Sequence, residues 1–170
     1  MAFTMYDASV PMLVRTLENL SAILAKGQDF AKDNGVDESS LVNARLADDM
    51  FPLTRQVQIA SDSAKGAGAR LAGVDVPSFE DSEATFDELQ ARVAKTIAFL
   101  KSLDESNFAN SEDSRIAFSN KGGSYDFNGK DFLFTYALPT FFFHVTTAYD
   151  ILRHKGVNLG KKDYLGSYQA

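Results

Sequence analysis

The two histidines of the chain, His144 and His154, are the side chains best suited to acid–base chemistry or metal binding. They lie ten residues apart in one apolar stretch that also contains Phe141 and Phe143. On a continuous helix this spacing separates them by about 15 Å, whereas the ligands of a metal ion lie about 2 Å from it. The two imidazoles therefore cannot share one metal, and each needs its own interpretation.

His144 is the stronger candidate for a functional group, because it lies beside the apolar seam of the last predicted helix. There it is either a core histidine hydrogen-bonded to a neighbour, or a ligand or base. Asp49 and Gln56, seven residues apart, share a face of an earlier predicted helix, and Arg45 is close in sequence. They are either cap and salt-bridge residues or a polar cluster that faces His144, of the kind that builds sites inside helical bundles. Tyr149 could supply a hydroxyl to that cluster.

His154 is predicted to be a structural residue at the end of the same helix. The helix macrodipole favours a positive charge near a helix C-terminus. Asp150 precedes His154 by four residues, which places the two side chains on one face, within reach of an ion pair.

The composition excludes several classes of function. The chain has 170 residues, 45% of them hydrophobic and 24% charged, as in a single soluble globular domain. Its net charge of −6 and the lack of a basic stripe argue against binding to nucleic acid. The absence of cysteine excludes disulfides, thiol nucleophiles and cysteine-ligated zinc, and it suits a cytoplasmic protein. Without a signal-peptide pattern or a run of about 20 apolar residues, we expect no association with a membrane.

The apolar pattern predicts an all-α four-helix bundle that forms a single domain over residues 1–170. Apolar residues recur at helical spacing in four segments, which cover about 9–35, 49–73, 82–103 and 130–154.

Local signals mark the ends and connections of these helices. Ser9 and Asp49 are candidate N-caps, and the spacing of Thr85 and Glu88 predicts a capping box. Two short strand patterns flank the run Asn120-Lys121-Gly122-Gly123, which indicates a small β-hairpin before the last helix. Pro139 predicts a kink within the last helix, because proline lacks a backbone donor.

Several runs, spread over nearly the whole chain, form a recognisable set. They are Ala44-Arg45-Leu46-Ala47-Asp48-Asp49-Met50-Phe51-Pro52-Leu53, Gln56-Val57-Gln58, Ala69-Arg70-Leu71-Ala72-Gly73, Phe86-Asp87-Glu88-Leu89, Phe143-His144-Val145-Thr146-Thr147-Ala148-Tyr149, Arg153-His154, Gly156-Val157, Leu159-Gly160-Lys161 and Asp163-Tyr164-Leu165-Gly166. This set resembles a bacterial family described as a domain of unknown function, within the DinB/YfiT-like superfamily of four-helix bundles.

The resemblance implies a DinB-like bundle and a place for a metal site. Proteins of that superfamily are often dimeric, and they include proposed metalloenzymes and thiol-dependent transferases. Their metal pattern has one histidine on the second helix and an HxxxH pair on the last. His144 matches the first of that pair, but Ala148 stands where the second would be. The second helix has no histidine, so Asp49 or Gln56 would have to substitute.

Two hypotheses of function follow. The first is a pocket with a degenerate metal site, lined by Asp49, Gln56, His144, Tyr149 and Arg45, that binds a small molecule or performs acid–base chemistry. We expect no metal there; if a divalent ion binds, its ligands would be His144 with Asp49 or Gln56. The alternative is a non-catalytic homodimer that pairs through the aromatic-rich last helix. The chain has no P-loop, dinucleotide fingerprint, nucleophile elbow or HExxH motif that would name a reaction.

Overall fold

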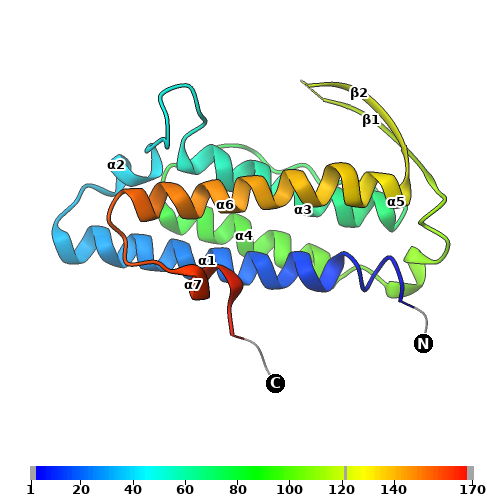
Figure 1. Ribbon diagram of the computed structural model, residues 1–170, viewed down its shortest axis with the longest axis horizontal. Coiled ribbons are helices and arrows are strands. Elements are labelled where there is room, and N and C mark those ends of the chain that lie inside the picture. The colour runs from blue at the N-terminus through cyan, green and yellow to red at the C-terminus, as the bar shows by residue number, and fades with distance from the viewer. Residues whose placement is uncertain (1–2, 121, 168–170) are drawn as a thin grey trace.

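Four long helices form the body of the computed structural model, which describes residues 3–120 and 122–167 (Figure 1). These helices are α1 (Val10–Asn34), α3 (Leu53–Leu71), α4 (Phe86–Lys101) and α6 (Leu138–His154). Helix α3 packs against both α4 and α6, and α1 packs against α4. The predicted all-α bundle with a small hairpin is confirmed. Helix α3 lies between α4 and α6 and is in contact with both of these helices.

Helix α1 begins and ends where the sequence indicates, but its cap differs from the prediction. Pro11 lies in the first turn, and Gly35 ends the helix with a φ of 63°, in the left-handed region that glycine tolerates. Ser9 is the N-cap residue, yet its side chain accepts no bond from the helix. Instead the Ser9 hydroxyl donates to the Met5 carbonyl at 2.6 Å, because the preceding turn presents that carbonyl to it.

Helices α3 and α4 start differently. The capping box of α4 is confirmed: the Glu88 amide donates to Thr85 Oγ1 at 3.2 Å, and the Thr85 amide donates to Glu88 Oε2 at 3.1 Å. The N-cap of α3 is Pro52, so the prediction of Asp49 as the cap was wrong. The short helix α2 (Glu38–Val42) ends well before that point, and the exposed loop that follows it carries Asp49.

The contact between α3 and α4 depends on a glycine. A Cβ atom at Gly68 would lie 2.6 Å from Leu100 Cδ2 and 2.8 Å from Leu103 Cδ1. A larger residue at this position would require both leucine side chains to move. The alanine-rich seam of α3 therefore packs as the sequence pattern indicates.

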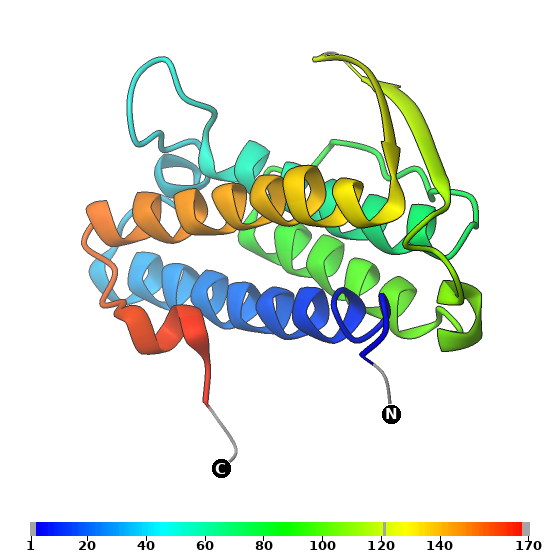
Figure 2. The same ribbon diagram turned by 45° about the vertical axis from the view of Figure 1, so that its right-hand side comes forward.

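The predicted hairpin is formed by β1 (Arg115–Asn120) and β2 (Gly123–Asn128), which follow the short 3-10 helix η1 (Glu105–Phe108). The strands are antiparallel, with Arg115 opposite Asn128 and Asn120 opposite Gly123. Lys121, in the turn, lies outside the described residues. Figure 2 shows the hairpin rising from one end of the bundle, beside the start of the last helical segment.

The last helical segment changes its winding before Pro139. A first turn, α5 (Gly129–Asp131), leads into a π-helical stretch, η2 (Phe132–Ala137), and α6 follows from Leu138. Proline cannot donate to the carbonyl four residues earlier, and a wider π turn is one way for a helix to accommodate this. The predicted disturbance at Pro139 thus takes the form of a change of helix type in the turns just before it.

The chain ends with α7 (Lys161–Leu165), a short helix that packs against α1. Lys26 of α1 pairs with Asp163 at 2.6 Å, and the Asn19 amide donates to the Tyr164 carbonyl at 3.0 Å. Within the described part of the chain, no helix has the length and apolar character needed to cross a membrane.

Candidate functional site

A chain of hydrogen bonds links the last long helix to the start of α3. His144 Nδ1 of α6 lies 2.7 Å from Gln56 Oε1 of α3, and Gln56 Nε2 donates to the Phe51 carbonyl at 3.0 Å. The Gln56 side chain is held between the helices, with only 1% of its surface exposed. The structure therefore brings together two of the residues singled out in the sequence, His144 and Gln56.

These bonds determine which nitrogen of His144 carries the proton. Because the Gln56 amide nitrogen donates to a carbonyl, its oxygen is the group that faces His144, and an oxygen can only accept. His144 Nδ1 is therefore the donor of a neutral imidazole, and its Nε2 keeps a lone pair. Nε2 has no hydrogen-bond partner among the residues that the structure describes.

The surroundings keep this imidazole neutral. Burial and, to a smaller extent, the nearby positive charge of Arg55 together lower the pKa of His144 to about 4. At neutral pH the ring is thus an uncharged hydrogen-bonding group that can accept a proton donor at Nε2.

His144 lines a hollow of about 610 Å³ between α3 and the last helical segment. Residues of α3 at successive helical turns form one wall, and residues of η2 and α6 at four-residue steps form the other. The hairpin closes the end opposite His144. The wall from α3 consists of Arg55, Ile59, Asp62, Ser63 and Arg70. The wall from the last helical segment consists of Phe132, Tyr136, Thr140 and His144. The hairpin contributes Phe118 and Tyr125. The volume is in the range of small-molecule sites in proteins.

A larger hollow, of about 770 Å³, is lined by the N-terminal segment, by η1 and by the start of the last helical segment. Phe3, Met5, Phe108 and Phe134 contribute its apolar lining. No histidine or arginine is among the described residues that line this larger hollow. The hollow beside His144 is therefore the better candidate for a functional site, although it is smaller, because its walls carry an imidazole and two guanidinium groups.

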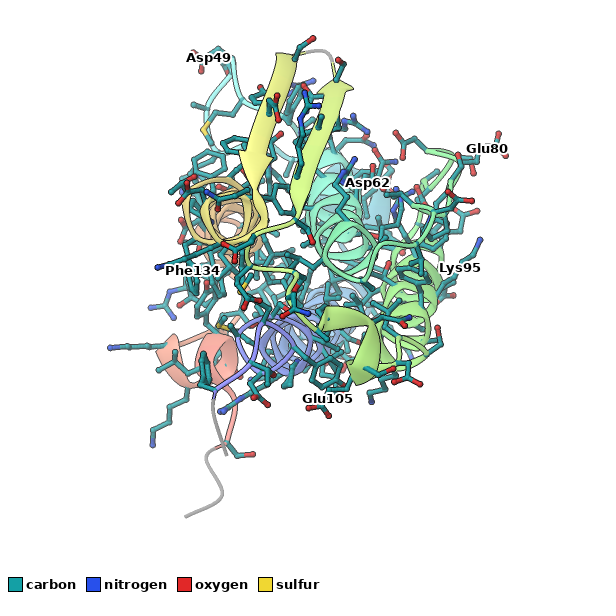
Figure 3. All side chains as sticks on the ribbon, turned by 90° about the vertical axis from the view of Figure 1, so that its right-hand side faces the viewer. Asp49, Asp62, Glu80, Lys95, Glu105 and Phe134 are labelled. Atoms are coloured by element: carbon teal, nitrogen blue, oxygen red, sulfur yellow. The ribbon has the colours of Figure 1, made fainter. Side chains whose placement is uncertain are left out.

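Three residues predicted to join His144 lie elsewhere. Asp49 is exposed in the loop before α3, and Figure 3 shows it at the periphery of the molecule. Arg45, in the same loop, donates to the Met50 carbonyl and so stabilises the loop itself. Tyr149 packs against Tyr164 of α7, with ring centroids 6.1 Å apart, because a step of five residues from His144 leads to another face of α6.

The groups around His144 do not fit a divalent metal ion. Gln56 Oε1 is engaged by the imidazole proton, and the fully buried methyl group of Ala148 offers no ligand atom. Over residues 3–120 and 122–167, no three side chains of histidine, aspartate or glutamate gather closely enough to hold a metal ion. One imidazole nitrogen is too few donors for any common protein metal site.

His154 lies in the last turn of α6, as the sequence indicates, but it forms no ion pair with Asp150. Asp150 is partly buried, and burial raises the pKa of its carboxyl group, whereas His154 is exposed. The prediction that these two residues pair was wrong.

Sequence reasoning did not select Arg70, Tyr136 or Phe118 as site residues, although all three line the hollow. One signal was present. Arg70 follows Gly66 by four residues, which is about one turn of the helix. A glycine one turn before a long side chain leaves room for that side chain to lie against the helix backbone.

Comparison with known proteins places the chain in a family. The family described as "Domain of unknown function (DUF1993)" matches residues 5–165. Among solved structures, the chain is similar to a DinB family member protein from Shewanella denitrificans, with 44% identity and a TM-score of 0.88. That alignment covers 97% of this chain and 94% of the other. A comparison with curated proteins found no match.

Proposed function

The chain belongs to the DUF1993 family and has a DinB-like fold, and from this premise we propose that it binds a small molecule in the hollow between α3 and α6. In this proposal His144 Nε2 accepts a hydrogen bond from the ligand, while Gln56 holds the ring in position. The observation that carries the proposal is the bonded series Phe51–Gln56–His144, which orients a neutral imidazole beside a hollow of suitable size.

The pKa of His144 favours ligand capture over acid–base turnover. A general base works best when its pKa lies near the working pH, whereas burial lowers the pKa of His144 to about 4. Such a ring is a weak base at neutral pH but a dependable hydrogen-bond acceptor, because it stays uncharged. The hollow would then occupy the place of the superfamily's metal site without its ligands, since Ala148 replaces the second histidine of the pair.

Thermal stabilisation by small molecules tests this proposal. A diverse library is screened for compounds that raise the melting temperature of the wild-type protein, and each active compound is repeated on His144→Gln and on His154→Gln. Glutamine at 144 can still bond to Gln56, so this variant keeps the helix contact while it loses the imidazole nitrogen. We expect active compounds to lose most of their effect on His144→Gln and to keep it on His154→Gln, the matched control. Equal effects on both variants would contradict the proposal.

A second candidate function, a homodimer through the last helical segment, rests on exposed aromatic side chains. Phe143 is 57% exposed and lies edge-on to the His144 ring, and Phe51, 54% exposed, lies in the neighbouring loop. Phe134 is 48% exposed and lies at the outer edge of the bundle in Figure 3. Exposed aromatic groups of this kind mark many protein interfaces.

Sedimentation of wild-type protein and Phe143→Ser tests the dimer. A dimer that dissociates in the variant supports it, and a wild-type monomer at high micromolar concentration contradicts it. The cytoplasmic location expected from the lack of cysteine stays a prediction.

A further inference from the structure

Arg70 lies folded back along its own helix at the hairpin end of the hollow. A Cβ atom at Gly66 would collide with Arg70 Nη1, so the guanidinium lies level with Gly66, one turn before its own backbone. The glycine is needed for this arrangement, because any other residue there would displace the guanidinium. The charge is thereby drawn back from the C-terminal end of α3, along the wall of the hollow.

The guanidinium of Arg70 is half-buried, and no described residue gives it an anionic partner. It lies 4.3 Å from the centre of the Phe118 ring of β1, a cation–π contact. Across residues 3–120 and 122–167, no carboxylate pairs with it and no side chain or carbonyl accepts its protons. Burial lowers the pKa of Arg70, but arginine remains charged at any physiological pH. Its planar fork of donors fits a carboxylate.

Flat side chains surround the space in front of this charge. Tyr136 of η2 lies 4.9 Å from Tyr125 and 5.4 Å from Phe118, measured between ring centroids. Asn120 Nδ2 donates to the Tyr136 hydroxyl at 2.9 Å, so the hydroxyl proton is free to donate in turn. Aromatic walls favour a planar, unsaturated body by stacking.

The two ends of the hollow are matched to a molecule of limited length. Gly66, which is level with the Arg70 guanidinium, and Gln56, which contacts His144, are ten residues apart on α3. That separation corresponds to about 15 Å along the helix. We propose that the ligand is an elongated aromatic carboxylate, bound by Arg70 at its carboxylate end and by His144 Nε2 through a hydroxyl at its other end. This inference rests on the proposed function, because it uses the same hollow.

Three related probes separate the contributions of the two ends. 6-Hydroxy-2-naphthoate carries both groups, 2-naphthol lacks the carboxylate, and 2-naphthoate lacks the hydroxyl. Calorimetric titration of the wild-type protein should give the tightest binding for the first compound. We expect about tenfold weaker binding for 2-naphthol, the effect of losing one charge-assisted pair, and a smaller loss for 2-naphthoate.

Variants assign these losses to residues. Arg70→Gln should weaken 6-hydroxy-2-naphthoate about tenfold and leave 2-naphthol unchanged. Arg153→Gln removes an exposed arginine that does not line the hollow, and it should change neither affinity. Melting curves of both variants check that they are folded. Arg70→Lys keeps the charge but not the planar fork of donors, so its affinity for 6-hydroxy-2-naphthoate should be intermediate.

The outcomes distinguish this inference from the proposed function. Equal affinity of the wild type for 6-hydroxy-2-naphthoate and 2-naphthol, or no binding of the carboxylate at all, would overturn the assignment of an aromatic carboxylate. Binding of 2-naphthol that depends on His144 would leave the proposed function standing in that case. Conversely, carboxylate binding that depends on Arg70 and is unchanged in His144→Gln would preserve the anion site and contradict the role of His144.

Discussion

Two arginines on opposite sides of α3, Arg70 of α3 itself and Arg92 of α4, have different surroundings. Arg92 of α4 has 1% of its side chain exposed and contacts the carboxylates of Asp62, Asp81 and Glu83 at 2.9 to 3.0 Å. Arg70, on the side of α3 that faces α6, contacts an aromatic ring and no carboxylate within the described residues. The guanidinium of Arg92 is already paired with carboxylates of the protein, whereas that of Arg70 can still bind an anion.

The difference follows from the connections on the two sides. The long segment between α3 and α4, residues 72–85, carries acidic side chains that cover Arg92, and it places Phe79 between Lys65 and Lys95. The hairpin on the other side carries mainly aromatic groups toward Arg70. A buried charge is costly unless it is paired, so the unpaired, half-buried Arg70 is a place where a ligand can supply the missing charge. Even Asp62, which lines the hollow, has its charge satisfied by Arg92 and Lys65.

Replacing each arginine by methionine gives the largest contrast. Arg92→Met leaves three carboxylates without their shared cation, and we expect it to reduce the free energy of unfolding by about 2–4 kcal/mol. Arg70→Met removes no ion pair and should change it by less than about 1 kcal/mol. Urea unfolding of both variants measures this. Similar losses in the two variants would show that Arg70 is as structural as Arg92.

The pH dependence of stability tests the buried state of His144. Its pKa is about 4 in the folded protein, below the ordinary value of 6.5. Between pH 6.5 and pH 4, therefore, the unfolded chain binds a proton at His144 that the folded protein does not bind. The stability that comes from keeping His144 neutral is fully present above pH 6.5 and is lost as the pH falls to about 4. We expect a loss of about 1–2 kcal/mol after allowance for partial exposure.

The matched control for that titration is His144→Gln, which should remove this loss over the same pH range. A wild-type profile that coincides with that of the variant would mean that the folded protein leaves the pKa of His144 unshifted.

Gly66→Ala should separate stability from binding. Alanine favours a helix over glycine by about 1 kcal/mol, and the only described atoms in its way belong to the flexible end of Arg70. We therefore expect the free energy of unfolding to rise by about 0.5–1 kcal/mol, while the displaced guanidinium binds 6-hydroxy-2-naphthoate more weakly. An alanine variant that binds the carboxylate as well as the wild type would show that the position of the guanidinium does not matter.

The architecture could be predicted from the sequence because its signals are local. Gly35 ends α1, Thr85 and Glu88 cap α4, and the turn after Asn120 joins two strands, each through contacts between residues a few positions apart. The pairing of His144 with Gln56 could also be anticipated, since each lies beside the apolar seam of its helix.

The rest of the site depends on contacts between distant segments and on small differences in helix phase. Asp49 shares a helical repeat with Gln56, but α3 begins only at Leu53, so Asp49 never belongs to that face. Tyr149 belongs to another face of α6 than His144. Arg70 became a candidate only when the structure showed the hairpin above it and no carboxylate beside it, in the residues described.

The central claim, that a small molecule binds the hollow through the free nitrogen of His144, is tested most directly by nitrogen NMR of the two imidazoles. In the protein alone we expect His144 to show a protonated Nδ1 and an unprotonated Nε2 at neutral pH. Addition of 6-hydroxy-2-naphthoate should shift the His144 Nε2 resonance and leave both nitrogens of His154 unchanged. A saturating ligand that leaves the His144 resonances where they were would contradict the account.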